Sequence, residues 1–169
     1  MLTSYAVAYG FAAVSLRYFN VGGAAYGLGE RHGTETHLIP IALQVAAGTR
    51  EALTVYGHDY PTPDGTCIRD YVHVKDLAAA HLLALPAPAP GEHRVYNLGS
   101  GSGFSVQEMV EAVRTVTGHA LPVVEGDRRA GDPARLVASS ARIREDLGWE
   151  PAHTALTEIV ADAWEFAQR

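Results

Sequence analysis

The chain has 169 residues, enough for one domain with its own hydrophobic core. Its net charge is −6, which argues against a nucleic-acid partner or an acidic membrane surface, because both require a basic face. The first ten residues carry polar groups throughout and no basic residue, so they predict neither a signal peptide nor a membrane span. They are typical of the end of an amphipathic helix that stops at Gly10.

Cysteine and histidine usage adds two expectations. Cys67 is the only cysteine, so no internal disulfide can form, and we expect a reducing, cytoplasmic setting. The eight histidines are scattered, without an H-x-x-x-H or cysteine-paired spacing, so we expect no metal site.

Strands and helices alternate along the rest of the chain. The apolar residues near 38–45 repeat at helical spacing, and Ser105 with Glu108 has the pattern of a capping box. In chain order we expect a strand at 12–19, a glycine-rich loop at 20–35, a helix from 38 that stops at Gly48, and strands at 53–56 and 68–72. A helix at 76–85 and a stiff linker at 86–91 follow. The last part of the chain should contain strands at 95–98 and 121–124, with a helix at 105–117 between them, and then helices at 140–147 and 154–168. This order predicts an α/β fold.

The segment 99–103 (G-S-G-S-G) follows a predicted strand and precedes a helix, as a dinucleotide-binding turn does. Position 104, where the third glycine belongs, is Phe104. We therefore interpret the segment as a glycine-rich turn rather than as the site of NAD.

Two cationic loops are candidates for binding an anionic ligand. Arg69 precedes Asp70, and Arg129 lies in a second loop with Asp132. Two arginines can clamp a diphosphate while a carboxylate takes a ribose hydroxyl, but a surface ion pair between Arg69 and Asp70 is equally compatible with the sequence.

Two further positions have a functional and a structural interpretation. Phe19 and Asn20 end a predicted strand, where open α/β sheets bind ligands, although a core aromatic and a turn residue would look the same. His73 with Asp76 could form an acid–base couple, but a structural hydrogen bond ahead of the helix is the favoured interpretation.

Five motifs in order give the chain a family resemblance that covers nearly its whole length. The chain resembles the UDP-glucose 4-epimerases of the extended short-chain dehydrogenase/reductase superfamily. The motifs are L-R-Y-F-N at 16–20, H-L-I-P at 37–40, the block from Leu53 to Ala78 that contains Y-P-T-P-D-G-T-C-I-R-D-Y-V-H-V, Y-N-L-G at 96–99 and R-R-A-G-D-P at 128–133.

The resemblance implies a role for each matching residue. Asn20, His37 and Leu38 would lie along the sugar and diphosphate, and Thr54, Val55 and Tyr56 along the uracil. Arg69 and Arg129 would meet the phosphates, Asp132 the uridine ribose, and Tyr71 the pocket wall. Tyr18 and Phe19 would approach the nicotinamide of NAD.

The resemblance also implies a reaction, the interconversion of UDP-glucose and UDP-galactose through a 4-keto sugar and bound NAD. The family's G-x-x-G-x-x-G turn and Tyr-x-x-x-Lys pair have no match here, because Tyr5 and Tyr9 have Tyr9 and Ala13 at i+4 and Lys75 is the only lysine. We therefore expect no catalytic residue and no activity from the chain alone.

We expect residues 1–169 to be the substrate-binding C-terminal portion of an NAD-binding Rossmann-like fold, with sheet-edge elements at about 1–20 and 76–98. The N-terminal NAD-binding portion would be absent, through truncation or a misplaced start, so a homodimer or association with a full-length copy is expected. Another NAD-dependent nucleotide-sugar epimerase or decarboxylase, and a non-catalytic UDP-sugar-binding or scaffold subunit, remain alternatives. The resemblance implies that Leu136 would fall where side-chain size affects the acceptance of N-acetylated sugars, which leaves this specificity open.

Overall fold

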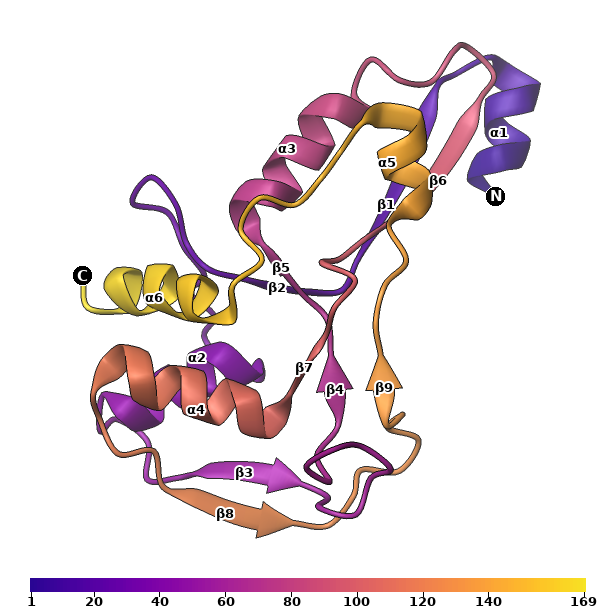
Figure 1. The fold of residues 1–169 in the computed structure, drawn as a ribbon. Helices are drawn as coiled ribbons and strands as arrows, with labels where there is room; N and C mark the ends of the chain where they lie inside the picture. The colour runs from indigo at the N-terminus through magenta and orange to yellow at the C-terminus, as the bar shows by residue number, and fades with distance from the viewer.

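The computed structural model describes residues 1–169 as an α/β fold of six helices and nine short strands (Figure 1). The helices are α1 (Leu2–Tyr9), α2 (Leu38–Ala46), α3 (Val74–Ala84), α4 (Val106–Thr117), α5 (Ala141–Leu147) and α6 (Leu156–Ala167). The strands are β1 (Ala13–Tyr18), β2 (Asn20–Gly22), β3 (Leu53–Tyr56), β4 (Ile68–Arg69), β5 (Tyr71–His73), β6 (His93–Leu98), β7 (Phe104–Ser105), β8 (Val123–Gly126) and β9 (Arg135–Leu136). None of the helices combines the length and the apolar character that crossing a bilayer requires.

Parallel pairing dominates the strand topology. β1 pairs with β6, β2 with β5 and β3 with β8, each in parallel, while β4 lies between antiparallel β7 and parallel β9. Parallel neighbours require crossover connections, and helices lie in them: α2 in the connection from β2 to β5, α3 in the one from β1 to β6, and α4 in the one from β3 to β8. The prediction of an α/β fold is confirmed.

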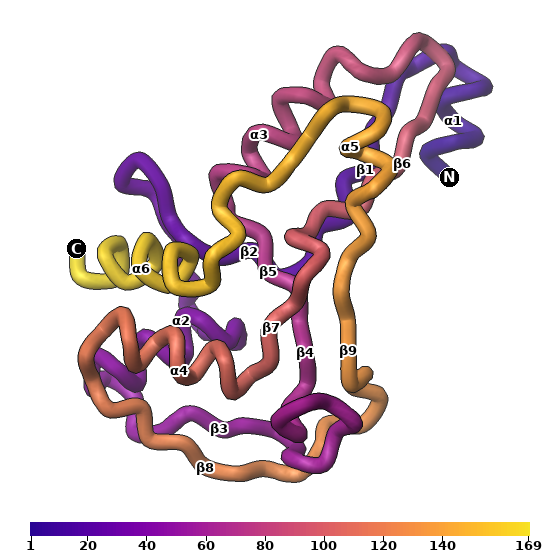
Figure 2. The backbone as a smooth tube through the Cα atoms, viewed as in Figure 1, coloured from indigo at the N-terminus to yellow at the C-terminus, as the bar shows by residue number.

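The buried apolar residues gather in two separate cores. Figure 2 shows the helices around them at opposite ends of the molecule, with α2, α4 and α6 at one end and α1, α3 and α5 at the other. The larger core has 16 buried residues and lies between α2, β3, α4 and α6. We call these four elements and β8 the large-core region. The smaller core has six buried residues, and we call α1, β1, α3, β6 and α5 the small-core region. The two regions therefore differ in how completely each can bury its own elements.

The large-core region is built from amphipathic helices, and α4 shows how the sequence sets the buried face and both ends of such a helix. On α4, buried residues recur at Met109, Val110 and Val113, one helical face. Ser105 and Glu108 form the predicted capping box, and Gly118 ends the helix in the left-handed conformation. The prediction of this helix is confirmed at both ends.

One predicted strand, 68–72, is divided at Asp70 into β4 and β5, which belong to different sheets. The Asp70 backbone N–H donates to Leu136 of β9, and its carbonyl accepts from Asn20 of β2. The chain changes sheets at this residue because its two peptide groups have partners on different strands. The short strands β2, β7 and β9 have too few residues to show a sequence periodicity and were not predicted.

Candidate functional site

The predicted site residues lie on or beside β1 to β5, at the start of α2, and in the loop that follows β8. Asn20 begins β2, and its backbone N–H and side-chain amide both donate to the Asp70 carbonyl, at 3.1 and 2.9 Å. Tyr18 is the last residue of β1 and is 52% exposed, while Phe19 is half-buried and donates its backbone N–H to Leu98. Tyr18 therefore presents an aromatic side chain at the carboxyl end of a parallel strand.

The glycine-rich segment 99–103 serves the fold. The buried Asp70 carboxylate accepts the backbone N–H groups of Ser100, Gly101 and Ala138, at 2.7 to 3.0 Å. A side chain at Gly99 would collide with this carboxylate. Because two N–H groups of the turn already bind Asp70, the turn does not form a phosphate cradle, which agrees with its interpretation as a structural turn.

Arg69 pairs with Asp132, and not with Asp70 as one interpretation of the sequence allowed. Its guanidinium donates to the Asp132 carboxylate and to the carbonyls of Ile68 and Pro133. The Arg69 side chain is 13% exposed, so these partners fix its position. The structure thereby brings together two residues that are 63 positions apart in the sequence.

The two neighbouring arginines of the second loop have different surroundings. Arg128 binds Asp59 and lies over the ring of Tyr60 at 4.2 Å. The guanidinium of Arg129 lies over the ring of Tyr56 at 4.0 Å and forms no ion pair. Stacking holds Arg129 at the end of β3 while its donors remain available to an anion.

Residues of β3 alternate between the site and the core. Val55 is buried in the larger core, whereas Thr54 is half-buried and Tyr56 is 38% exposed. Tyr71 of β5 also lies in the larger core, and burial raises the pKa of its hydroxyl well above the ordinary range. The side chains of Val55 and Tyr71 are therefore part of the wall behind any ligand.

His37 and Leu38 begin α2. His37 is exposed at the N-cap and Leu38 is half-buried against the larger core. The next residue, Ile39, packs against Gly22 of β2, where a Cβ atom would meet its side chain. This contact brings the start of α2 to the strand that begins at Asn20.

His73 has a structural role and is not coupled to Asp76. Its Nδ1 accepts the backbone N–H of Lys75, and its Nε2 faces the Asp162 carboxylate at 3.1 Å. Burial lowers the pKa of His73, while the nearby Asp162 raises it to a lesser extent. Asp76 instead accepts the backbone N–H groups of Ala152 and His153.

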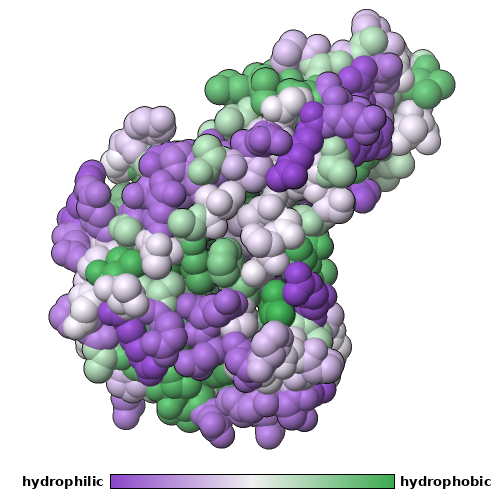
Figure 3. Space-filling model, in the orientation of Figure 1, coloured by the Kyte–Doolittle hydropathy of each residue, from purple (hydrophilic) through white to green (hydrophobic).

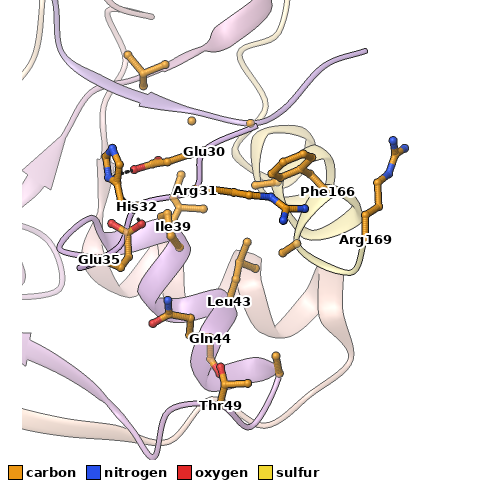
Figure 4. Close-up of a pocket in the computed structure, with 17 residues that line it drawn as sticks. Glu30, Arg31, His32, Glu35, Ile39, Leu43, Gln44, Thr49, Phe166 and Arg169 are labelled. Carbon is orange, nitrogen blue, oxygen red and sulfur yellow. Dashed lines mark hydrogen bonds and ion pairs between the residues drawn. The ribbon is translucent and has the colours of Figure 1, made fainter. Parts of the chain in front are cut away.

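A cavity of about 400 Å³ lies between α2 and α6, and none of the predicted site residues lines it (Figure 4). Arg31 lies over the ring of Phe166 at one end of it, and His32 lies with Glu30 and Glu35 at the other. Sequence reasoning missed this group, although the spacing E-x-H-x-x-E-x-H from Glu30 to His37 is a readable signal.

These observations define an α/β protein with parallel strands, whose candidate ligand-binding residues are carried by short strands and the loops and helix that adjoin them. A family model described as the NAD dependent epimerase/dehydratase family matches residues 1–99. The chain belongs to this family.

Individual relatives are more specific in name. The chain is 58% identical to a UDP-glucose 4-epimerase of Corynebacterium glutamicum over 98% of its length and 50% of the relative's. It superposes with a TM-score of 0.91 and 49% identity on the Brucella ovis UDP-glucose 4-epimerase in complex with NAD, over 98% of this chain and 52% of that one. The Bifidobacterium longum enzyme, in complex with NAD+ and UDP, gives 0.90 and 36%, over 98% and 50%. The chain spans about half the length of the relatives it matches.

The residues present fit only one end of a bound NAD. Tyr18 is exposed at the end of β1, where a planar ring can lie against it. The glycine turn at 99–103 uses its N–H groups on Asp70 and leaves no cradle for a pyrophosphate.

Proposed function

We propose that this chain is the UDP-sugar-binding, C-terminal portion of a UDP-glucose 4-epimerase. In this proposal Arg69 and Arg129 bind the diphosphate, Asp132 the uridine ribose, and the β3 segment the uracil. Asn20, His37 and Leu38 face the sugar. Residues 1–169 then form one substrate-binding unit that includes edge elements of a Rossmann-like sheet.

The observation that carries the proposal is the contrast between two adjacent arginines. Arg128 is neutralised by Asp59, whereas Arg129 has no carboxylate partner and is positioned by the ring of Tyr56. An unpaired arginine held by stacking fits a phosphate, because its planar fork binds two oxygens at once. Arg69 supports this assignment, since its ion pair with Asp132 keeps both groups in fixed positions at the end of β4.

The sugar needs a looser contact than the nucleotide, because a 4-keto intermediate must present both faces to the cofactor. Bound NAD supplies the hydride chemistry. The residues of this chain hold the UDP through charged and aromatic groups, and near the sugar they offer the neutral amide of Asn20, which Asp70 fixes. This division fits a protein that anchors UDP and leaves the hexose free to turn.

We infer that the chain alone has no epimerase activity. Tyr5 and Tyr9 lack a lysine at i+4, and the only lysine, Lys75, is bound to Asp162 at 2.8 Å. Incubation of the pure chain with UDP-galactose and NAD should therefore yield no UDP-glucose. Turnover that copurifies with the chain through several columns would contradict this inference.

Calorimetric titration with UDP tests the binding role. We expect Arg129→Ala to weaken UDP binding about tenfold or more, because a charge-assisted hydrogen bond is lost. Arg128→Ala is the matched control, with an expected change of less than about twofold, since exposed ion pairs contribute little. Equal losses in both variants would mean that the loop acts only through its net charge.

The surface of the small-core region supports association with another polypeptide, either a second copy or a full-length epimerase. Apolar residues are exposed over α1 and α3, as Figure 3 shows at the end of the molecule that carries these helices. Tyr9 of α1 is 76% exposed and Leu82 of α3 is 69% exposed. Size-exclusion chromatography with light scattering tests this, and a monodisperse monomer would argue against it.

The free Cys67 supports a cytoplasmic location.

A further inference from the structure

Four side chains of the loop that joins β2 to α2 converge on one point. Glu30, His32, Glu35 and His37 each offer one potential ligand atom, and these atoms all lie within 4.8 Å of one another. They come from eight consecutive residues, so the local path of the chain is enough to assemble them. Figure 4 shows His32 directed at Glu30 and Glu35 at one end of the cavity.

The distances between the atoms approach those of a tetrahedral metal site. His32 Nδ1 lies 2.8 Å from a Glu30 oxygen and 4.0 Å from a Glu35 oxygen. His37 Nδ1 lies 2.9 Å from the Glu30 oxygen and 2.8 Å from a Glu35 oxygen. Ligand atoms around a tetrahedral zinc ion are about 3.3 Å apart, which falls within this range. Small side-chain movements would therefore accommodate an ion at the centre.

Hydrogen bonding alone leaves the cluster unbalanced. A neutral imidazole has one N–H, yet Nδ1 of His37 faces carboxylate oxygens of both Glu30 and Glu35. The Glu30 oxygen in turn faces the Nδ1 atoms of His32 and His37. Two carboxylates in contact with one N–H repel each other, and a divalent cation at their midpoint would remove this repulsion.

One ligand is already held in place by the backbone. An oxygen of Glu35 accepts the N–H groups of Thr36 and His37, at 2.8 and 2.7 Å, and its side chain is only 7% exposed. Second contacts of this kind orient a metal-binding carboxylate before the ion arrives. The loop is thereby positioned at the start of α2, where His37 is the N-cap.

We propose that Glu30, His32, Glu35 and His37 form a binding site for a divalent transition-metal ion of the zinc class. Two imidazoles and two carboxylates suit zinc, whereas magnesium and calcium favour sites made of oxygen ligands. Four protein ligands fill a tetrahedral shell, so the ion would fasten the loop to α2 and would not carry a reactive water. The site shares His37 with the residues proposed to face the sugar, whereas Glu30, His32 and Glu35 lie outside that set.

The test uses the full 169-residue chain, freed of metal with a chelator and titrated with Zn²⁺ in equilibrium dialysis. We expect one ion per chain and a higher thermal midpoint in the presence of Zn²⁺, because the ion binds the folded state. Replacement by Co²⁺ should give the intense visible absorption of tetrahedral coordination. Mg²⁺ at the same concentration should produce neither change.

The variant His32→Ala/His37→Ala should lose at least about 100-fold in Zn²⁺ affinity, since even indirect partners of a metal contribute 10- to 100-fold. Glu30→Gln keeps the shape of the side chain and should also weaken binding. The matched control is His58→Ala/His119→Ala, which removes two exposed histidines outside the cluster and should leave the affinity unchanged. Absence of saturable binding, or equal affinity in the cluster and control variants, would overturn the proposal.

Discussion

The large-core and small-core regions solve the same packing problem to different extents. In the large-core region, α2, α4 and α6 pack against one another, and each of them buries at least three residues. In the small-core region, α1 buries only Ala6, and no residue of β1 is fully buried. The first region encloses its core, whereas the second leaves much of its apolar surface to solvent.

This difference follows the division of the proposed function. The residues proposed for the nucleotide, such as Tyr56 and Arg129, extend from the enclosed region. Those proposed for the nicotinamide, Tyr18 and Phe19, end the open strand β1. A strand with one parallel neighbour and an exposed side is an edge that a further strand or domain can cover. The comparison therefore predicts that the two regions respond differently to substitution.

The largest effect is expected in the enclosed core. Ile159→Ala removes a side chain that is 0% exposed, which should cost about 3–4 kcal/mol of unfolding free energy through lost burial and a residual cavity. Urea unfolding can be followed by two reporters, because Trp149 lies in the smaller core and Trp164 packs on the larger one. Trp149→Phe and Trp164→Phe leave one reporter each.

If the regions are separable, Ile159→Ala will shift the transition seen by Trp164 more than the one seen by Trp149. Coincident transitions in both single-tryptophan backgrounds would instead show that the two cores unfold as one cooperative unit.

An intermediate effect is expected at the junction between the regions. Asp70→Ala leaves the N–H groups of Ser100, Gly101 and Ala138 without their acceptor, and we expect a loss of about 2–3 kcal/mol. Because Asp70 separates β4 from β5, this variant should also pull the two tryptophan transitions apart. A loss no larger than that of an exposed substitution, such as Asp59→Ala, would show that solvent replaces these bonds.

A smaller, pH-dependent effect is expected at His73. Its pKa is lowered in the folded state, mainly by burial, so the unfolded chain binds the proton more readily. Stability should therefore be complete above the ordinary histidine pKa of about 6.5 and fall as the pH is lowered below it. Burial raises the pKa of Asp162, but Lys75 and His73 outweigh this effect and hold the pKa below its usual value. Protonation of Asp162 therefore adds a further loss of stability only at still lower pH.

Urea unfolding between pH 7 and 5 measures this dependence. His73→Gln should flatten the curve in that interval, and His119→Gln, at an exposed site, should not. An unchanged slope in the His73 variant would assign the acid sensitivity to other groups.

The sequence predicted most of what depends on local pattern. The capping box of α4, the stop at Gly118 and the alternating α/β order needed only neighbouring residues, and the structure has them. The division of a predicted strand at Asp70 and the pairing of Arg69 with Asp132 depend on contacts more than 30 positions apart, which periodicity does not record. The Glu30–His37 cluster escaped prediction for another reason, because its two histidines are five positions apart and the glutamates that complete it fall outside an H-x-x-x-H spacing. The nucleotide-binding roles are what the resemblance implies, and the UDP titration of Arg129→Ala is the measurement that tests them.

The smallest effect is expected on the open face. Val7 of α1 is 74% exposed, so Val7→Ser should change the stability of the isolated chain by no more than about 0.5 kcal/mol. The same substitution should weaken the binding of a second polypeptide that covers α1, because the apolar surface of α1 then becomes part of an interface. Chemical unfolding measures the first quantity, and titration with the NAD-binding half of a related epimerase, expressed separately, measures the second. Thr117→Ser, in the large-core region, serves as a conservative control for both. A cost of 2 kcal/mol or more in the isolated chain would mean that α1 already has a packing partner, and the contrast between an enclosed and an open region would fail at the element where it is sharpest.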